Sequence, residues 1–314
     1  MMDIPEPDSK LKLRDGEMVH EIPVYRFGSG RPRILITAGL HGGEVTGQYA
    51  ASRLTEAMKG LDEAPSGEIV ITPRCNPSAF RRMQRTSPFD DLDMNRVFPG
   101  DEEGSPTQVL ASRIWDVAAD CDYIVDLHCA GPYAAPYALA QYQEYDNCRE
   151  LAEMLDIPAV VQSGGSEGQL FVEAARRGIP AAIIELPGGG PDGIIDLAAS
   201  QDAFGALTRL LTLLEFLPGD ATKPKPRFCT RLNKLTASHE GLYLPQMAPG
   251  ENYRNGDVVG ILGGERLLAE GAGYCVVNRP AGYVFPTTGL AALANFADDE
   301  SDDSPGLPTA PMTN

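Results

Sequence analysis

The sequence predicts an α/β protein of three layers, in which a mixed sheet lies between helices, followed by a smaller all-β region. Short runs that are apolar throughout alternate with segments of helical period, which is typical of a sheet covered on both faces. We expect strands at residues 20–27, 33–38, 68–73, 123–127, 158–162 and 180–186. We expect helices at residues 45–59, 107–119, 146–155, 168–177 and 194–217.

A change of composition divides the chain into two domains and a tail. The segment KPKPRF, residues 223–228, indicates a linker, because its prolines suit neither a helix nor a strand. The short strands and glycine turns that follow predict a small β-barrel or sandwich. We therefore expect an α/β domain over 1–222 and a β domain over 223–297. The acidic tail, 298–314, has little to bury and is expected to be disordered.

The charge and the cysteines limit the class of protein. Of 314 residues, 44 are acidic and 26 basic, which gives a net charge of -18. A chain this acidic is not expected to bind nucleic acid or an anionic membrane, because both need a concentrated positive face. Its six cysteines form no CxxC pair, and we find neither a signal sequence nor a membrane-spanning stretch. We expect a cytoplasmic protein, and the sequence leaves its assembly into a homo-oligomer open.

Metal-binding side chains follow two of the expected strands at the point where each strand ends. His41 and Glu44 lie in the segment HGGE, directly after the strand at 33–38, and His128 ends the run YIVDLH. The carboxyl ends of parallel strands meet at one edge of a sheet, where α/β proteins bind ligands. Two histidines and a glutamate form a ligand set of catalytic zinc sites, in which a fourth position is left for water. These residues therefore predict a metal site at this edge.

A third strand end carries a carboxylate, Glu185, in the segment PAAIIELPGGG. A carboxylate at the end of an apolar strand is expected to be paired or to take part in chemistry. Because a metal-activated water needs a group to accept its proton, Glu185 is the candidate general base. An ion-paired strand end is the alternative. We expect Asp126, two residues before His128, to face away from it, which leaves open whether Asp126 orients that histidine.

Residues 76–100 are expected to form a loop that is rich in turn-forming residues and arginines. Such a loop is suited to binding a substrate carboxylate through two parallel hydrogen bonds. The loop carries four candidate arginines, Arg81, Arg82, Arg85 and Arg96, and Asn95 adds a neutral hydrogen-bond donor beside Arg96. Ordinary surface charge is the alternative for each arginine.

Four motifs together carry a resemblance to a known family. The segments HGGE, DMNRVFPG, DLH and IELPGG occur in this order and resemble those of the succinylglutamate desuccinylase and aspartoacylase family, which is related to the zinc carboxypeptidases. The resemblance covers roughly residues 20–217 and implies a mixed sheet of the zinc-carboxypeptidase type. It also implies that one zinc ion per chain is bound by His41, Glu44 and His128.

The resemblance further implies roles for residues outside the ligand set. Glu185 would be the general base and acid, Asn95 and Arg96 would hold the substrate's carboxylate, and Arg85 would lie near the carbonyl oxygen. The family usually has DLNR where this chain has DMNR, and the change from leucine to methionine conserves size and apolarity. The spacing between Arg85 and Asn95 is stretched by the segment TSPFDD.

The expected function is that of a zinc-dependent deacylase, which cleaves the amide bond of a small N-acyl amino acid. A metallocarboxypeptidase that acts on peptides is the alternative, because it uses the same ligands and a similar carboxylate clamp. The C-terminal region is similar to the biotinyl/lipoyl-type barrel of the diaminobutyrate deacetylase-like branch. Its hairpin GGERLL carries no lysine for modification, so we expect this module to act as a lid or an assembly surface.

Two further motifs favour other enzyme classes less strongly. Gly164, Ser166 and Gly168 satisfy the GxSxG pattern of a serine hydrolase, which would need His239 as its base. The segment GGGPDG, residues 188–193, satisfies the GxGxxG pattern of dinucleotide binding. It has a proline inside the phosphate loop and no acidic residue at the expected distance.

Overall fold

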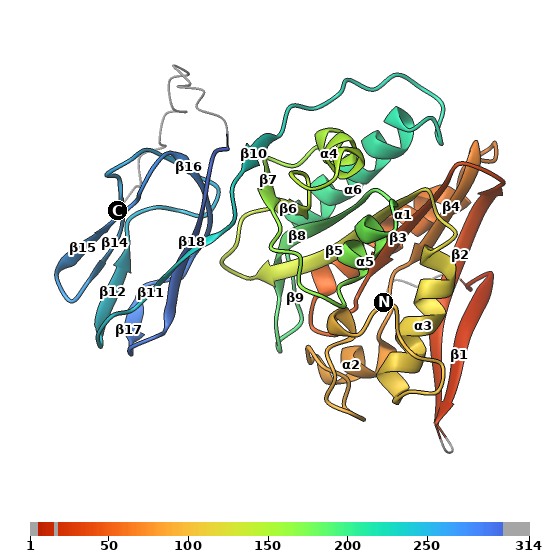
Figure 1. The fold of residues 1–314 in the computed structure, drawn as a ribbon, viewed down its shortest axis with the longest axis horizontal. Helices are drawn as coiled ribbons and strands as arrows, with labels where there is room; N and C mark the ends of the chain where they lie inside the picture. The colour runs from red at the N-terminus through yellow and green to blue at the C-terminus, as the bar shows by residue number, and fades with distance from the viewer. Residues whose placement is uncertain (1–5, 16–17, 298–314) are drawn as a thin grey trace.

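The computed structural model describes residues 6–15 and 18–297 and has one large mixed sheet and two small antiparallel sheets (Figure 1). The large sheet has the strand order β1-β2-β4-β3-β5-β8-β6-β7-β10, with β9 paired to β8. Its strands are β1 (Ser9–Asp15), β2 (Met18–Ser29), β3 (Arg33–Ala38), β4 (Gly67–Thr72), β5 (Tyr123–Gly131), β6 (Tyr137–Ala140), β7 (Ala159–Gln162), β8 (Ala181–Gly189), β9 (Ile194–Ile195) and β10 (Arg227–Cys229).

The centre of the large sheet is parallel. β3 pairs in parallel with β4 on one side and with β5 on the other, and β5 pairs in parallel with β8. The carboxyl ends of β3, β5 and β8 therefore lie at the same edge. β6 runs antiparallel to β8, so its first residue, Tyr137, is the register partner of Glu185.

Helices cover both faces of the large sheet and bury two apolar layers. On one face, α1 (Val45–Lys59), α4 (Asp146–Glu153) and α6 (Leu197–Leu213) pack against the sheet through buried residues such as Leu54, Leu151 and Leu207. On the other face, α3 (Pro106–Ala118) and α5 (Leu170–Arg176) contribute Leu110 and Phe171. The predicted three-layer α/β class is therefore confirmed. No helix in the described ranges is long and apolar enough to cross a membrane.

The two small sheets form a C-terminal β module. One has the order β11-β18-β16-β13 and the other β15-β14-β12-β17, and buried residues from both sheets, such as Val259 and Leu293, pack between them. The strands are β11 (Asn233–Thr236), β12 (Gly241–Pro245), β13 (Asn252–Tyr253), β14 (Val258–Leu262), β15 (Glu265–Leu268), β16 (Gly273–Asn278), β17 (Gly282–Val284) and β18 (Gly289–Asn295). The small all-β region that the sequence predicts is therefore present.

The module is joined to the large sheet through the segment between β5 and β6. The backbone N–H of Ala135 donates to the carbonyl of Val276 at 2.8 Å, and the hydroxyl of Tyr274 donates to the carbonyl of Pro136 at 3.1 Å. β10 begins inside the expected linker at 223–228, because Arg227 and Phe228 pair in parallel with β7 at the edge of the large sheet, so the linker is shorter than expected. The boundaries 1–222 and 223–297 stay predictions, and the predicted disordered tail lies outside the described residues.

Most of the expected elements are confirmed, and the differences have local causes. Residues 76–100 are not all loop, because they contain α2 (Pro77–Arg82) and the 3₁₀ turn η1 (Met94–Arg96). Asn76 caps α2 by accepting a hydrogen bond from Ala79 N–H at 3.1 Å, and Pro77 occupies the first turn. Residues 194–195, expected to begin a helix, instead form β9.

Candidate metal centre and active site

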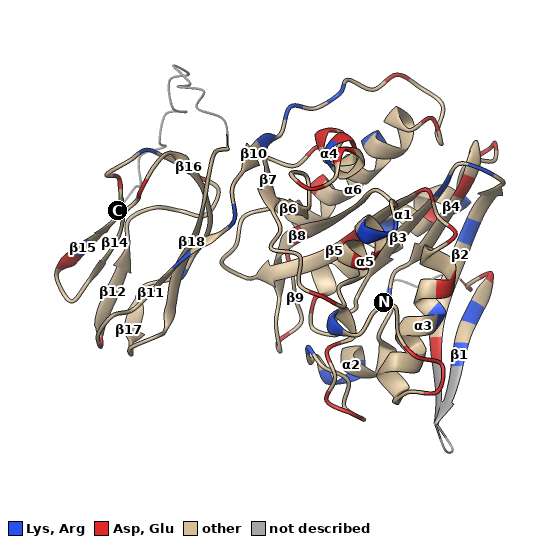
Figure 2. Ribbon diagram, viewed as in Figure 1, with Lys and Arg blue, Asp and Glu red and all other residues tan. Residues whose placement is uncertain are grey.

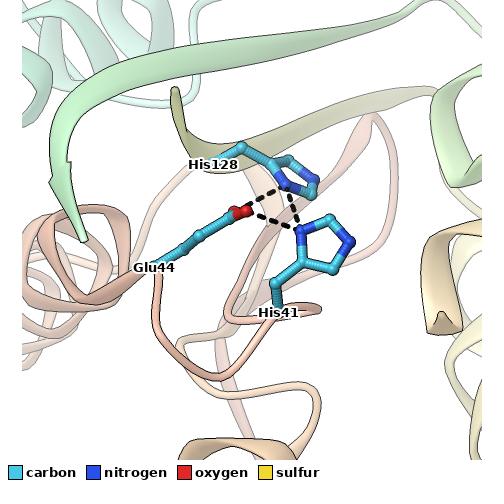
Figure 3. A group of neighbouring side chains, drawn as sticks. All are labelled: His41, Glu44 and His128. Atoms are coloured by element: carbon cyan, nitrogen blue, oxygen red, sulfur yellow. Dashed lines mark hydrogen bonds and ion pairs between the residues drawn. The ribbon is translucent and has the colours of Figure 1, made fainter. Parts of the chain in front are cut away.

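Three side chains from two separate segments converge at the carboxyl edge of the sheet (Figure 3). His41 lies in the turn after β3, Glu44 is the residue before α1, and His128 lies near the end of β5. The turn is tight because Gly42 packs directly against the backbone of α2. The structure thus brings together the two strand ends that the sequence places at one edge.

The donor atoms of these side chains face one another. One carboxylate oxygen of Glu44 lies 2.7 Å from His41 Nδ1, and the other lies 2.8 Å from His128 Nδ1. The two Nδ1 atoms are 3.2 Å apart. Both histidines are 2% exposed, so the group is screened from bulk water. Two imidazole nitrogens and a carboxylate in this arrangement could hold a metal ion.

The outer nitrogen of each imidazole is bound by a second carboxylate. His41 Nε2 lies 2.9 Å from Asp93 Oδ1, and His128 Nε2 lies 2.7 Å from Asp126 Oδ2. Asp126 is itself held by the hydroxyl of Thr37, which donates to it at 2.7 Å. Carboxylates in this position hold a proton on the outer nitrogen and leave the inner nitrogen free to bind a metal. The donor set therefore fits a zinc ion.

The close contacts shift the protonation of the whole group. Burial alone would lower the pKa of His128, but the carboxylates of Asp126 and Glu44 outweigh it and raise that pKa well above its usual range. Burial alone would raise the pKa of Glu44 and of Asp93, but the neighbouring histidines hold both pKa values well below the usual range. The acids are thus ionised at neutral pH, as metal ligands and their partners must be.

Glu185 lies on β8, the strand next to β5, beside the candidate metal ligands His41, Glu44 and His128. Its register partner on β5 is His128, and register partners on adjacent strands point to the same face of a sheet. Within residues 6–15 and 18–297, we find no hydrogen bond or ion pair to its carboxylate. Burial raises the pKa of Glu185 to about 7, with the charge of His128 opposing this shift. Glu185 is thus a largely buried carboxyl group next to the site, with no partner among the described residues.

Asn95 and Arg96 lie beside the metal-binding group but differ in exposure. Asn95 is 2% exposed, its Oδ1 accepts the backbone N–H of Leu170 at 2.9 Å, and its Nδ2 lies 3.4 Å from His128 Nε2. Arg96 is exposed, and one of its terminal nitrogens donates to the carbonyl of Asn95 at 2.6 Å. Arg96 keeps donors for a ligand, whereas the oxygen of the Asn95 side chain is already bound within the protein.

Arg85 reaches the metal-binding group despite the stretched spacing. Its Nε donates to Asp93 Oδ2 at 2.9 Å, and its Nη1 lies 3.8 Å from a carboxylate oxygen of Glu44. The intervening segment folds back on itself, because Ser87 N–H donates to the carbonyl of Leu92 at 3.0 Å. The extra residues therefore form a closed turn and do not move Arg85 away from Asp93.

The two other motifs do not form the sites that they would require. Ser166 lies in a surface loop, whereas His239 lies in the C-terminal module, where its Nδ1 is 2.9 Å from the carbonyl oxygen of Glu240. The glycines at residues 188–193 form the hairpin between β8 and β9 and do not lead into a helix N-terminus. A serine triad and a dinucleotide-binding loop are thus unsupported.

Comparison with known proteins agrees with these observations. The model of the succinylglutamate desuccinylase/aspartoacylase catalytic domain matches residues 30–211, which contain all the candidate site residues. The chain belongs to this family. A curated relative, the N-alpha-acetyl-L-2,4-diaminobutyric acid deacetylase of Halomonas elongata, is 30% identical over 195 residues. That match covers 59% of this chain and 56% of the relative, so the chain spans just over half the relative's length.

Solved structures of similar proteins share both parts of the fold. An aspartoacylase family protein from Mesorhizobium loti is 25% identical with a TM-score of 0.76, and the match covers 94% of this chain and 97% of that one. The product-bound ectoine utilization protein EutE (DoeB) from Ruegeria pomeroyi is 23% identical with a TM-score of 0.74, covering 91% and 94%. The similarity therefore extends through the β module of this family member.

Two carboxylates beside the ligand set were missed in the sequence of this aspartoacylase-family protein. Our expectation that Asp126 faces away from His128 is wrong, because residues two apart on a strand share a face. This signal was present in the sequence. Asp93 begins the DMNR motif, but its bond to His41 joins segments 52 positions apart and could not be inferred from spacing.

Proposed function

We propose that the protein is a zinc-dependent amidohydrolase that removes the acyl group from a small N-acyl amino acid. The observation that supports this most directly is the convergence of His41, Glu44 and His128, with both outer imidazole nitrogens bound by carboxylates. One zinc ion held there would supply Lewis acidity toward an amide carbonyl oxygen and toward a water molecule. The curated relative is named for an N-acetyl diamino acid, so compounds of this kind are the first substrates to test.

Glu185 would move the proton that amide hydrolysis requires. A carboxylate oxygen of Glu185 accepts a proton as water attacks the acyl carbon, and it then delivers that proton to the nitrogen of the leaving amine. Two features support this role, namely its place beside His128 and the absence of a competing partner among the described residues. A pKa raised by burial to about 7 suits a group that both accepts and donates near neutral pH.

The arginines would orient the substrate. Arg96, which is exposed, would bind the carboxylate of the substrate, and Asn95 would offer its remaining amide N–H. Arg85 lies closer to the ligand set and would donate to the oxygen of the acyl group as negative charge develops on it. Its bonds to Asp93 hold its guanidinium in place before the substrate arrives.

The test is hydrolysis of a panel of substrates by the zinc-loaded protein. The panel contains N-acetyl and N-succinyl amino acids, N-acetyl diamino acids and short peptides. We expect the N-acyl amino acids to be cleaved, chelation to abolish the activity, and Glu185→Gln to lower kcat at least about 100-fold. Glu167→Gln, which changes an exposed glutamate, is the matched control and should behave as wild type.

Three outcomes would contradict the proposal. Purified protein that holds no zinc and is active without it would exclude metal-dependent hydrolysis. Wild-type kcat in the Glu185→Gln variant would exclude Glu185 as the base. Cleavage of peptides alone would identify a carboxypeptidase instead.

A further inference from the structure

A cavity of about 390 Å³ lies beside α2 and outside the candidate metal centre. Cationic and aromatic side chains form much of its lining, namely Lys10, Tyr25, Arg74, Phe80 and Arg81. Arg81 belongs to α2, whose arginines are blue in Figure 2. The proposed hydrolysis uses none of these side chains.

Arg74 is held rigidly in this cavity. Its Nε donates to Gln48 Oε1 at 3.1 Å, and its guanidinium carbon lies 3.6 Å from the centre of the Phe80 ring. Burial lowers the pKa of Arg74, and the positive charge of Arg81 lowers it further. The two guanidinium groups are therefore close enough to repel each other.

Neither arginine has an acidic partner in the part of the chain that the structure describes. This is unusual in a protein with 44 acidic and 26 basic residues, where carboxylates are plentiful. Of the two glutamates that line the cavity, Glu21 is bound by Lys10 at 2.8 Å, and Glu6 forms no ion pair with Arg74 or Arg81. Repulsion between two neighbouring cations without a counterion is unfavourable, and a bound anion would offset it.

We propose that this cavity binds a small oxyanion, a phosphate or carboxylate group, between Arg74 and Arg81. Guanidinium groups suit such ligands because they donate two parallel hydrogen bonds to two oxygens. The ring of Phe80 fixes the guanidinium plane of Arg74, so little conformational entropy is lost on binding. The ligand would be a free metabolite or buffer anion, or the same group on a larger molecule.

The anion site is connected to the metal-binding turn. Gln48 accepts the hydrogen bond from Arg74 and donates from its Nε2 to the carbonyl of Gly42 at 3.2 Å. Gly42 lies between His41 and Glu44 in the turn. An anion bound to Arg74 would therefore affect Gln48, whose side chain supports the turn that carries His41 and Glu44. The binding itself does not depend on the proposed hydrolase activity.

The test is calorimetric titration of the zinc-loaded protein with inorganic phosphate and, separately, with succinate. We expect binding of at least one of them, and affinity reduced about tenfold or more in Arg81→Gln, because one charge-assisted pair is lost. Arg82→Gln is the matched control, since Arg82 is exposed on the same helix and does not line the cavity. Tighter binding of phosphate identifies phosphoryl ligands, and tighter binding of succinate identifies carboxylates.

Two results would overturn the proposal. One is the absence of binding of either anion to the wild-type protein. The other is equal affinity in Arg81→Gln and Arg82→Gln, which would place the anion elsewhere, such as at the metal centre. Because Arg81 is exposed, the substitution should not impair folding, and thermal unfolding of both variants checks this directly.

Discussion

Replacing Gly42 by alanine tests whether the metal-binding turn depends on close backbone packing. A Cβ atom at Gly42 would lie closer than 3.0 Å to backbone atoms of Ala79 and Phe80, a separation that real Cβ atoms do not show. Backbone cannot rotate away as a flexible side chain can. The turn is also fixed from the other side, because Gly42 N–H donates to the carbonyl of Gln84 at 2.8 Å. Either the turn or α2 must therefore move.

The size of the effect follows from this contact. Insertion of a methyl group into a tightly packed site typically costs about 1–3 kcal/mol of unfolding free energy, and we expect the upper part of this range because the opposing atoms are backbone. Movement of the turn also displaces His41 and Glu44 relative to His128. We expect zinc affinity to fall about tenfold or more, as it does when groups that orient metal ligands are changed.

Denaturant unfolding of the metal-free protein and competitive zinc titration measure these two effects separately. Gly205→Ala is the control, because Gly205 lies in α6 and an added Cβ atom there would have nothing within 4 Å. The same change at Gly205 should therefore stabilise the fold by about 0.5–1 kcal/mol. Wild-type stability together with wild-type zinc affinity in Gly42→Ala would refute the reasoning.

Three other contacts each give a testable expectation. Asp126→Asn should weaken zinc binding about 10–100-fold, because His128 loses its carboxylate partner, and unchanged affinity in a chelator competition would contradict this. Burial alone would raise the pKa of the Asp90 carboxyl group, but hydrogen bonds from the start of α3 lower it below the ordinary value of 3.8. The stabilisation of the fold by these bonds is therefore complete above pH 3.8, and it is lost as the pH falls through the pKa of Asp90 in the folded protein. Denaturant unfolding between about pH 2 and 6 should therefore show that the loss of unfolding free energy in Asp90→Asn becomes smaller in acid. A loss that stays constant over this pH range would contradict the expectation. Tyr274→Phe should cost about 1 kcal/mol, because the bond to the carbonyl of Pro136 is lost, and no change in unfolding free energy would exclude a role for this bond in joining the module.

Local patterns in the sequence were sufficient to predict the fold class and the edge of the sheet at which the candidate site lies. The apolar run before His41 predicts β3, and the run that ends in His128 predicts β5, with the strand bounds at 33–38 matching the structure. Because these strands are parallel, their carboxyl ends had to meet at one edge. The same reasoning placed Glu185 there. These features depend only on hydrophobic period and chain direction, which neighbouring residues determine.

Other features could not be predicted, because they depend on contacts between distant segments. The bond of Asp93 to His41 and the bond of Tyr274 to the segment before β6 each link residues far apart in the chain. Spacing carries no information about such contacts.

The sequence by itself determined which residues can bind a metal and at which strand ends they lie. Only the tertiary structure decided which nitrogen of each histidine faces inward, since this depends on where Asp93 and Asp126 lie. It also decided that Arg74 and Arg81 share a cavity without a carboxylate partner in the described part of the chain. The physical reason is that hydrophobic period is a local property, whereas the protonation and pairing of charged groups depend on every group that the fold brings near them.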